Sequence, residues 1–505
     1  MDSRQSTELK EEIKKNKNSV TVKGIGPSLF GYHALGKVSF VKTAQSNMKE
    51  LLKLMDEFDQ QDKGRQTSVM IDYFVAGPFI NSRTGEDARR QHLSFTHSLS
   101  RPKDYIQYTL EEIQKSTESN LSISLNDFVR LPVLASLVHG MFGVQLEEAP
   151  DYKNVLDVFE GILNTANSDW MTKINTRLVA TYYPSVFNLK SDFREARQQY
   201  IDAAEKFLSN QADEVLHGID DYVDGVALSH LKNVLTYSVL ELIREKHPEY
   251  KNNPFEFRRF LDKIGKDEVK EYLYDYYIRT IPGSVAAGSN VVLIVGCALV
   301  ALAKNPKLRD ALREELSELE ILSDTNPESI QRIIESDRRE NGLLNRVYLE
   351  SLRRETMLKS SEQLDFDSNL WRYTDKNIEF DHQTIPAKSA VVVLNGMLRF
   401  DPEFWDEPGN FDLDRFIETQ NDQQKDKQKI AIAESVFSHG SRVCPANKIS
   451  EYIIKVMLAY MVMHYDWDLE YKDEKNATLN NVIIHVKSLE NKQELEMNMS
   501  QAMRN

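Results

Sequence analysis

One short segment near the C-terminus carries the residue types best suited to chemistry. The chain has only two cysteines, and Cys444 ends the pattern Phe437-x-x-Gly440-x-Arg442-x-Cys444. The amphipathic pattern after it predicts a helix whose positive dipole end faces the sulfur and favours its thiolate form. Gly440 allows the segment to turn close to a flat cofactor. We therefore interpret Cys444 as a metal-holding thiolate, with Phe437 covering the sulfur and Arg442 neutralising an acidic group of the cofactor.

Composition narrows the class of protein. The chain of 505 residues is 41% hydrophobic and 9% aromatic, which is typical of a folded protein with a large core. A formal net charge of −15 and the absence of a basic run argue against a nucleic-acid partner. Two cysteines cannot form a disulfide framework, and they fit a reducing compartment. We therefore expect a cytoplasmic protein.

The sequence predicts neither a leader nor a membrane span. Residues 1–20 are charged and polar at first, and we expect them to form a disordered lead-in without the apolar core of a signal peptide. The longest apolar run, residues 291–303, is shorter than the roughly 18–20 residues that cross a membrane. We expect this run to be a buried core helix.

Helical patterns dominate the middle of the chain. A long helix is predicted over residues 267–304, and because its second half is apolar nearly all round, it should run through the centre of the protein. Asn305-Pro306 should end it. Further helices are predicted over residues 227–245, 254–264, 307–319 and 342–355, and after Cys444.

Strands are predicted near both ends of the chain. One pair is expected over residues 68–79, and others over residues 370–374, 378–380, 389–394 and within 467–497. The polar stretch 419–429 is predicted to be a mobile surface loop. The sequence therefore predicts a mainly α protein with a small β-rich region.

The cysteine segment resembles the cysteine loop of the cytochrome P450 family, whose thiolate is the axial ligand of haem iron. Two further motifs match this family in the same order along the chain. Glu350-x-x-Arg353 resembles its Glu-x-x-Arg helix, in which positions i and i+3 share a face and pair. Residues 411–416 resemble its meander motif, whose arginine, here Arg415, completes a triad with that pair, and the preceding segment also matches.

This resemblance, specific from about residue 265 to 470, implies a fold and a cofactor. The fold would be the cytochrome P450 fold, a helical bundle around haem with a small β-rich region, in one domain over residues 21–505. The cofactor would be haem b, iron protoporphyrin IX, with Cys444 as the iron ligand. Arg442 and Arg372 would bind its propionates. The third-helix propionate ligand stays open, because the family's Trp-x-x-x-Arg is missing and the candidates are Arg90, His92 and Arg101.

The long helix departs from the family pattern on which oxygen activation depends. Family members that activate dioxygen usually carry an acid followed by a threonine there, and these relay protons. Here Ser289 replaces the acid and Asn290 the threonine. An amide cannot act as an acid at neutral pH, but it donates and accepts hydrogen bonds. Asn290 either positions the species at the iron or bends the helix by bonding its own backbone.

Other residues in and around the cysteine loop, and the second cysteine, are expected to have structural or surface roles. Ala446 replaces the usual glycine two residues after the cysteine, and because alanine is small we expect the loop to keep its shape. Cys297 is expected in the core, and His439 is expected to be exposed near a propionate. Lysines flanking the cysteine loop are either solvated or form a docking face for an acidic electron donor: Lys425, Lys427, Lys429, Lys448 and Lys455.

Three functions remain open from the sequence. The first is a monooxygenase that acts on an apolar or amphipathic small molecule (a lipid, sterol or secondary metabolite), with NADPH electrons from a reductase partner and Asn290 as the catalytic residue. The second is an isomerase or dehydratase of fatty-acid hydroperoxides, which needs the thiolate but neither a proton relay nor external electrons. The third is a non-catalytic haem sensor. We expect the first, within lipid metabolism, because no fused output domain supports the third.

Overall fold

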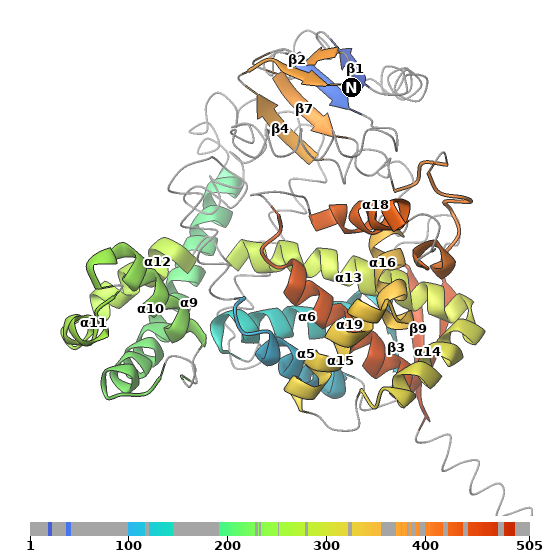
Figure 1. Ribbon diagram of the computed structural model, residues 1–505. Helices are drawn as coiled ribbons and strands as arrows, with labels where there is room; N and C mark the ends of the chain where they lie inside the picture. Colours follow the sequence, from blue (N-terminus) through green and yellow to red (C-terminus); the bar gives the residue numbers. More distant parts are fainter. Residues whose placement is uncertain are drawn as a thin grey trace, which may run out of the picture.

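The computed structural model describes a helical body and three small sheets (Figure 1). The described residues are 19–22, 37–41, 99–116, 121–144, 191–227, 231, 234–250, 252–277, 281–321, 326–354, 370–374, 376–380, 383–385, 387, 389–393, 399–402, 404–417, 423–437, 443–472 and 479–489. The predicted strand pair at residues 68–79 lies outside them. The predicted disordered lead-in is wrong at residues 19 and 20, which begin a strand, and its other residues also lie outside.

Two groups of helices make up the described helical part. The larger group forms the body: α5 (Pro102–Ser116), α6 (Leu125–Phe142), α13 (Ile281–Lys304), α14 (Pro306–Glu318), α15 (Pro327–Glu340), α16 (Leu343–Arg354), α18 (Gln423–Glu434) and α19 (Asn447–His464). The smaller group lies to one side in Figure 1: α9 (Ser191–Val223), α10 (Val234–Lys246), α11 (Pro254–Leu261) and α12 (Lys266–Tyr277). The prediction of a mainly α protein with a small β region is confirmed.

Helix α13 runs through the middle of the body and packs against α6, α16 and α19. Its second half is buried, with Val295, Ala298 and Leu302 at 0% exposure. The Asn305 side chain accepts a hydrogen bond from the Leu308 backbone N–H at 3.2 Å, which caps α14 and separates it from α13 as the sequence predicts.

The single helix predicted over residues 267–304 is wrong, because the structure has two. Helix α12 ends at Tyr277 and α13 begins at Ile281. Pro282 stands at the second position of α13, in the first turn, where its missing N–H costs nothing because it would have no partner within the helix. Proline therefore favours a helix start at this point.

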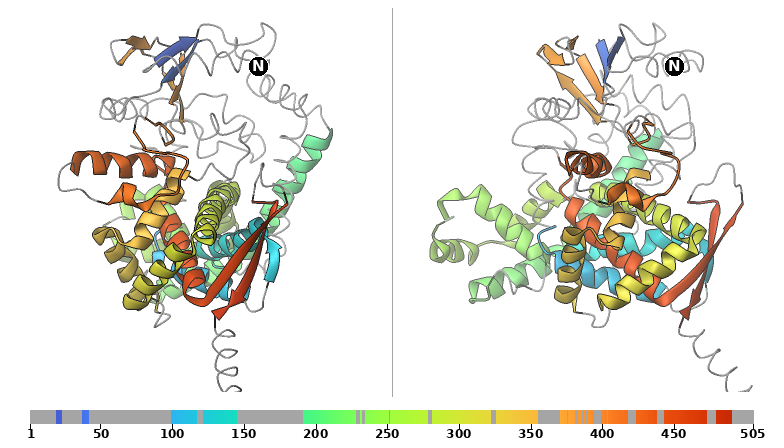
Figure 2. Two further views of the ribbon diagram at one scale, coloured as in Figure 1. Left: turned by 90° about the vertical axis from the view of Figure 1, so that its right-hand side faces the viewer. Right: turned by 45° about the vertical axis from the view of Figure 1, so that its right-hand side comes forward.

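A four-stranded sheet joins the first described strands to the second half of the chain. Its order is β1 (Ser19–Val22), β2 (Lys37–Val41), β7 (Ser389–Val393) and β4 (Leu370–Thr374). Strands β2 and β7 are parallel, with Lys37 opposite Ser389, and the other pairs are antiparallel. This sheet lies on the α18 side of the helical body in both views of Figure 2.

Two smaller sheets are antiparallel. Strand β9 (Val482–Ser488) lies between β3 (Leu121–Ser124) and β8 (Tyr465–Tyr471), which confirms the predicted closing strands over these residues. Strands β5 (Ile378–Phe380) and β6 (Gln383–Ile385) form a hairpin. Trp467 of β8 is 1% exposed, and its indole N–H donates to the Leu299 carbonyl of α13 at 3.0 Å. This bond ties the closing hairpin to the central helix.

The loop predicted over residues 419–429 is also wrong in part, because α18 begins at Gln423. The stretch contains neither glycine nor proline and is rich in glutamine and lysine, which are good helix formers. Ile432 and Ala433, which follow it in α18, are buried at 2% and 0% exposure. Polar composition alone therefore does not predict a loop here.

In the described part of the chain, no single helix has the length and apolar composition needed to cross a membrane. Residues 290–304 and 306–318 satisfy that criterion only together, and they meet at an angle of 110°.

Helices α5 and α6 meet at an unusually close contact. The Tyr105 side chain of α5 is fully buried against Gly140 of α6, and a Cβ atom at position 140 would lie 2.2 Å from Cε1 of the ring. A planar ring in a packed core has no nearby rotamer that relieves such an overlap.

We predict that Gly140→Ala lowers the free energy of unfolding by about 1–3 kcal/mol, because the two helices must separate to admit the methyl group. Chemical denaturation monitored by circular dichroism measures the change. Gly265→Ala is the control, since nothing lies within 4 Å of a Cβ there. Equal stability of the two variants would contradict the tight contact.

Candidate functional site

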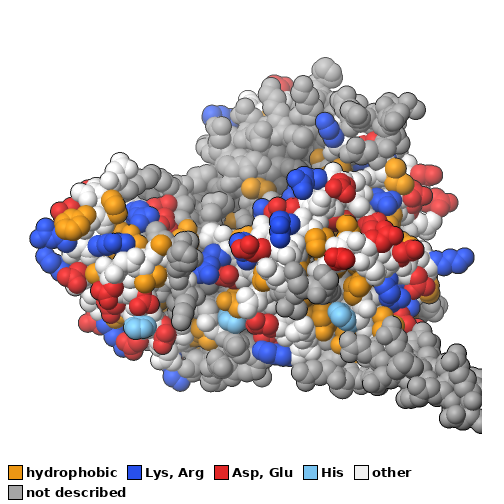
Figure 3. All heavy atoms as spheres, turned by 60° about the horizontal axis from the view of Figure 1, so that its bottom comes forward, with side chains coloured by type: hydrophobic (Ala, Val, Ile, Leu, Met, Phe, Trp, Pro, Cys, Tyr) orange, Lys and Arg blue, Asp and Glu red, His pale blue; other side chains and the backbone are white. Residues whose placement is uncertain are grey.

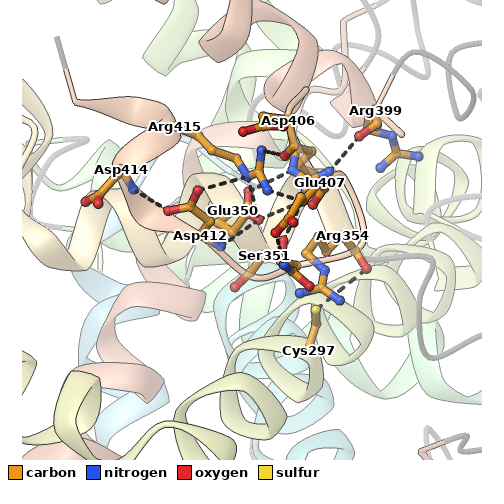
Figure 4. Close-up of polar contacts among 12 residues, drawn as sticks. Cys297, Glu350, Ser351, Arg354, Arg399, Asp406, Glu407, Asp412, Asp414 and Arg415 are labelled. Carbon is orange, nitrogen blue, oxygen red and sulfur yellow. Dashed lines mark hydrogen bonds and ion pairs between the residues drawn. The ribbon is translucent and has the colours of Figure 1, made fainter. Parts of the chain in front are cut away.

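A buried ion pair lies on one face of α16. The Arg353 and Glu350 side chains are both 0% exposed, and they form a two-pronged contact of 2.7 Å from Nε to Oε2 and 2.6 Å from Nη2 to Oε1. Arg415 approaches the same carboxylate, with its Nε 3.7 Å from Glu350 Oε1. The three residues predicted to form a triad therefore meet in the structure, and Figure 4 shows Arg415 beside Glu350.

The guanidinium groups also fix the backbone of the segment before the cysteine loop. Arg353 donates to the carbonyl of Arg399 at 2.7 Å and to that of Asn410 at 3.2 Å. Arg415 donates to the carbonyls of Asp406 and Glu407, the latter at 2.8 Å. Buried carbonyls need such partners, so this segment is held to α16 by charge-assisted hydrogen bonds.

Arg399 is a member of this network that the sequence did not single out. Its side chain is fully buried, and Nη1 donates to the Leu352 carbonyl of α16 at 3.0 Å. No spacing signal marks it, because its partners are backbone groups of a helix distant in the sequence. An open polar hollow of about 490 Å³ lies beside the network, lined by Asp406, Glu407, Asn410, Phe411, Asp412 and Arg415.

Cys444 lies just ahead of α19. Its backbone N–H donates to the carbonyl of Phe437 at 2.7 Å, and its carbonyl accepts from the N–H of Asn447 at 3.3 Å. The N-cap of α19 is Ala446, which gives no side-chain hydrogen bond to the first turn. The helix start that the sequence predicts after the cysteine is confirmed. The N–H groups of the first turn of α19 come directly after Cys444 in the chain.

The site combines a buried Glu-x-x-Arg pair, a third arginine and a cysteine before a helix. A comparison with known families points to the same family as these features. A family model described as Cytochrome P450 matches residues 28–495. The chain belongs to the cytochrome P450 family. In this P450, Glu350, Arg353 and Arg415 are the matches to the family's triad.

Relatives of this P450 are distant. Cytochrome P450 705A5 of Arabidopsis thaliana is 23% identical over 262 residues, which are 52% of this chain and 44% of that protein. Cytochrome P450 monooxygenase notH of Aspergillus sp. (strain MF297-2) is 23% identical, over 45% of this chain and 44% of the relative. Tabersonine 16-hydroxylase 2 of Catharanthus roseus is 35% identical over 19% of this chain and 18% of the relative. The matched region spans less than half of each relative's length.

The two cysteines of the P450 differ in accessibility. Cys297 is 6% exposed in α13, and its thiol lies 3.6 Å from the carbonyl of Arg354, so the expected core position is confirmed. Cys444 is half-buried. A soft, partly open thiol that precedes a helix start is a suitable donor for haem iron, so the residues present fit the cofactor that the family implies.

Asn290 is exposed in α13, whereas its nearest described neighbours are buried. Gly288, Val291 and Val292 around it are buried. At Gly288 the helix lies so close to α6 that a Cβ would be 2.7 Å from Leu134 Cδ2. The exposed Asn290 amide can donate and accept hydrogen bonds, while the side chain of Ser289 is not among the described ones.

Other predicted site residues are only partly described. Arg372 lies in β4, where it is the register partner of Val391 in β7, but its side chain is not described. Phe437 ends the short 3-10 turn Ser435–Phe437 and is half-buried. Arg101 pairs with Asp104 at 2.7 Å and donates to the Leu231 carbonyl at 2.9 Å. Four predicted residues lie outside the described chain: Arg90, His92, His439 and Arg442.

The lysines near the cysteine loop do not form one surface. Lys448 is exposed at 56% of its side chain, and Lys427 is also exposed. Lys429 is 17% exposed beside Asp426, and the side chain of Lys425 is not described. Lys455 is fully buried, so for this lysine both alternatives, a solvated side chain and a place on a docking face, are wrong. Charges of both signs alternate over the face of the molecule in Figure 3, without a large basic patch.

We predict that Arg353→Met lowers the free energy of unfolding by about 3–5 kcal/mol, because it leaves the Glu350 carboxylate buried without its partner. Thermal and urea denaturation measure the loss. Arg259→Met is the matched control, since that side chain is 67% exposed and 3.8 Å from Glu256. It should cost less than about 1 kcal/mol. Similar losses in both variants would show that the buried pair is not special.

Proposed function

We propose that this P450 is a haem-thiolate monooxygenase that inserts an oxygen atom into an apolar or amphipathic small molecule. One observation carries the proposal: Cys444 is half-buried directly before α19, with its N–H bonded to the carbonyl of Phe437, whereas Cys297 is in the core. Bound haem b supplies an iron centre that activates dioxygen with electrons from a donor protein.

The chain's own residues would hold and orient the cofactor. Cys444 would ligate the iron, and Phe437 would shield the sulfur from oxidation. Arg372 and Arg442 would bind propionates by charge-assisted hydrogen bonds, as guanidinium groups bind carboxylates. Asn290, the exposed amide on α13, would position a water or substrate oxygen by donating a hydrogen bond.

The names of the relatives support oxygen insertion. A monooxygenase from Aspergillus and tabersonine 16-hydroxylase 2 from Catharanthus roseus are among them. We propose that the substrate of this P450 is a lipid, a sterol or a secondary metabolite, and that the electrons come from NADPH through a reductase partner.

A second candidate rests on the composition of α13. An enzyme that rearranges fatty-acid hydroperoxides needs the thiolate but no proton relay, and α13 carries Ser289 and Asn290 where an acid followed by a threonine is usual. Incubation with a fatty-acid hydroperoxide, without reductase or dioxygen, separates the two. Rapid rearrangement there would overturn the monooxygenase proposal. No turnover there, together with NADPH-dependent product in a reductase-coupled assay, would overturn the second candidate.

We predict that Cys444→Ala abolishes the ferrous–CO absorption band that gives the family its name, because the thiolate that produces the band is removed. Absorption spectra of the reduced, CO-treated protein measure it. Cys297→Ala should keep the band, since that thiol lies in the core. A band that persists in Cys444→Ala would refute the assignment of the iron ligand.

We predict that Asn290→Leu, which keeps the size but removes the amide, lowers the rate of NADPH-dependent product formation about tenfold, the worth of one lost hydrogen bond of about 1.4 kcal/mol. The ferrous–CO band should stay unchanged, because the cysteine side is untouched. Product and NADPH consumption are measured together. If neither the rate of product formation nor the amount of product per NADPH consumed changes, Asn290 has a role in helix shape alone.

A further inference from the structure

A lysine is completely buried in the third turn of α19. The Lys455 side chain is 0% exposed, and its ammonium group lies 3.1 Å from Asp337 Oδ2, 3.1 Å from Glu451 Oε1 and 2.9 Å from Asn345 Oδ1. It also lies 5.5 Å from the centre of the Tyr348 ring. A lysine is almost never fully buried without such partners, and here the ammonium group donates hydrogen bonds to Asp337 and Asn345 and forms an ion pair with Glu451.

We call Lys455 with Asp337, Asn345, Tyr348 and Glu451 the Lys455 cluster. It joins three helices, because Asp337 belongs to α15, Asn345 and Tyr348 to α16, and the other two to α19. A second cation extends it outward: Arg338 lies 3.1 Å from Glu451 and 3.6 Å from Glu434 of α18. The buried lysine therefore balances carboxylates contributed by two different helices.

Stability alone does not explain a buried charge cluster. Removing charges from water is costly, and apolar residues of similar volume often stabilise a protein as well or better. The cost is visible in the pKa of Asp337 and of Glu434, which burial raises against the opposing pull of Lys455 and of Arg338, respectively. A cluster of this kind places a fixed field inside the protein.

Part of the cluster lies on the helix that follows the cysteine. Lys455 and Glu451 lie on the helix that begins at Asn447, so Lys455 is roughly 12 Å along the axis from that helix start at 1.5 Å per residue. Tyr348 lies beside this lysine, whose ammonium nitrogen is 5.5 Å from the centre of the tyrosine ring. Burial raises its pKa well above the usual value, and the charges of Glu451, Glu434 and Cys444 raise it further. Tyr348 therefore lies within electrostatic range of both Glu451 and Cys444.

We propose that Lys455 is a positioning residue that sets the charge around Cys444 and thereby the reduction potential of the haem iron. The inference rests on the proposed haem-thiolate function. Reduction adds one electron, taken from a reductase or a chemical reductant, and converts ferric to ferrous iron. A fixed cation stabilises the form with the extra negative charge, and buried carboxylates oppose it. Lys455 would thus keep the iron reducible beside two buried carboxylates.

The test is a redox titration of the haem-loaded protein with dithionite and mediators, followed by absorption. At an effective dielectric constant of about 20, a unit charge about 12 Å from the start of α19 shifts a one-electron equilibrium centred there about tenfold. Lys455→Met should therefore raise the ferric-to-ferrous ratio about tenfold at a fixed potential. Lys448→Met is the matched control: it removes the same charge from the same helix at an exposed position, and solvent should screen its effect.

Asp337→Asn gives a test of opposite sign and keeps the shape of the side chain. It removes a buried negative charge, so it should shift the equilibrium toward ferrous iron. This variant therefore tests the proposal even if Lys455→Met does not fold. Equal shifts in Lys455→Met and Lys448→Met, or no shift in Asp337→Asn, would overturn the proposal. Absence of a ferrous–CO band in the unmodified protein would instead overturn the haem-thiolate function itself.

Discussion

The buried contact between Glu350 and Arg353 is the constraint on which the rest of the site depends. It places a fully enclosed charge pair on α16, and such a pair is tolerated only when every remaining donor has a partner. The donors are satisfied by carbonyls of Arg399 and Asn410, so the segment that leads to the cysteine loop is fixed by the same interaction. Residues 399 and 410 of this segment are thus held to α16 by electrostatics.

Much of the fold followed from local signals, and the exceptions have physical causes. The Asn305-Pro306 cap and the strands at residues 370–374 and 378–380 were predicted, because capping and β-branched or aromatic runs act within a few residues. The start of a separate helix at Ile281 was not predicted, because the apolar pattern was given more weight than Pro282, a residue typical of a first helical turn. Helix α18 was missed because polarity was given more weight than the absence of helix breakers.

The site shows the same division. The triad and Cys444 could be found because i, i+3 spacing and the cysteine pattern lie within single segments. Lys455 could not, since a lysine in an amphipathic helix is usually solvent-exposed. Its burial is decided by Asp337 and Asn345, which lie on other helices and far back in the chain. Sequence spacing thus identifies Cys444 as the candidate ligand, whereas the burial of Lys455 and its pairing with charged residues are seen only in the structure.

The parallel pairing of β2 with β7 has a consequence for how the chain is made. Lys37 is opposite Ser389, so β2 has no partner on that edge until roughly 350 further residues have been synthesised. At 5–20 residues per second, this interval lasts on the order of tens of seconds. An unpaired strand edge is a template for pairing with other chains. The newly made protein therefore passes through a period of aggregation risk that ends only when its second half emerges from the ribosome.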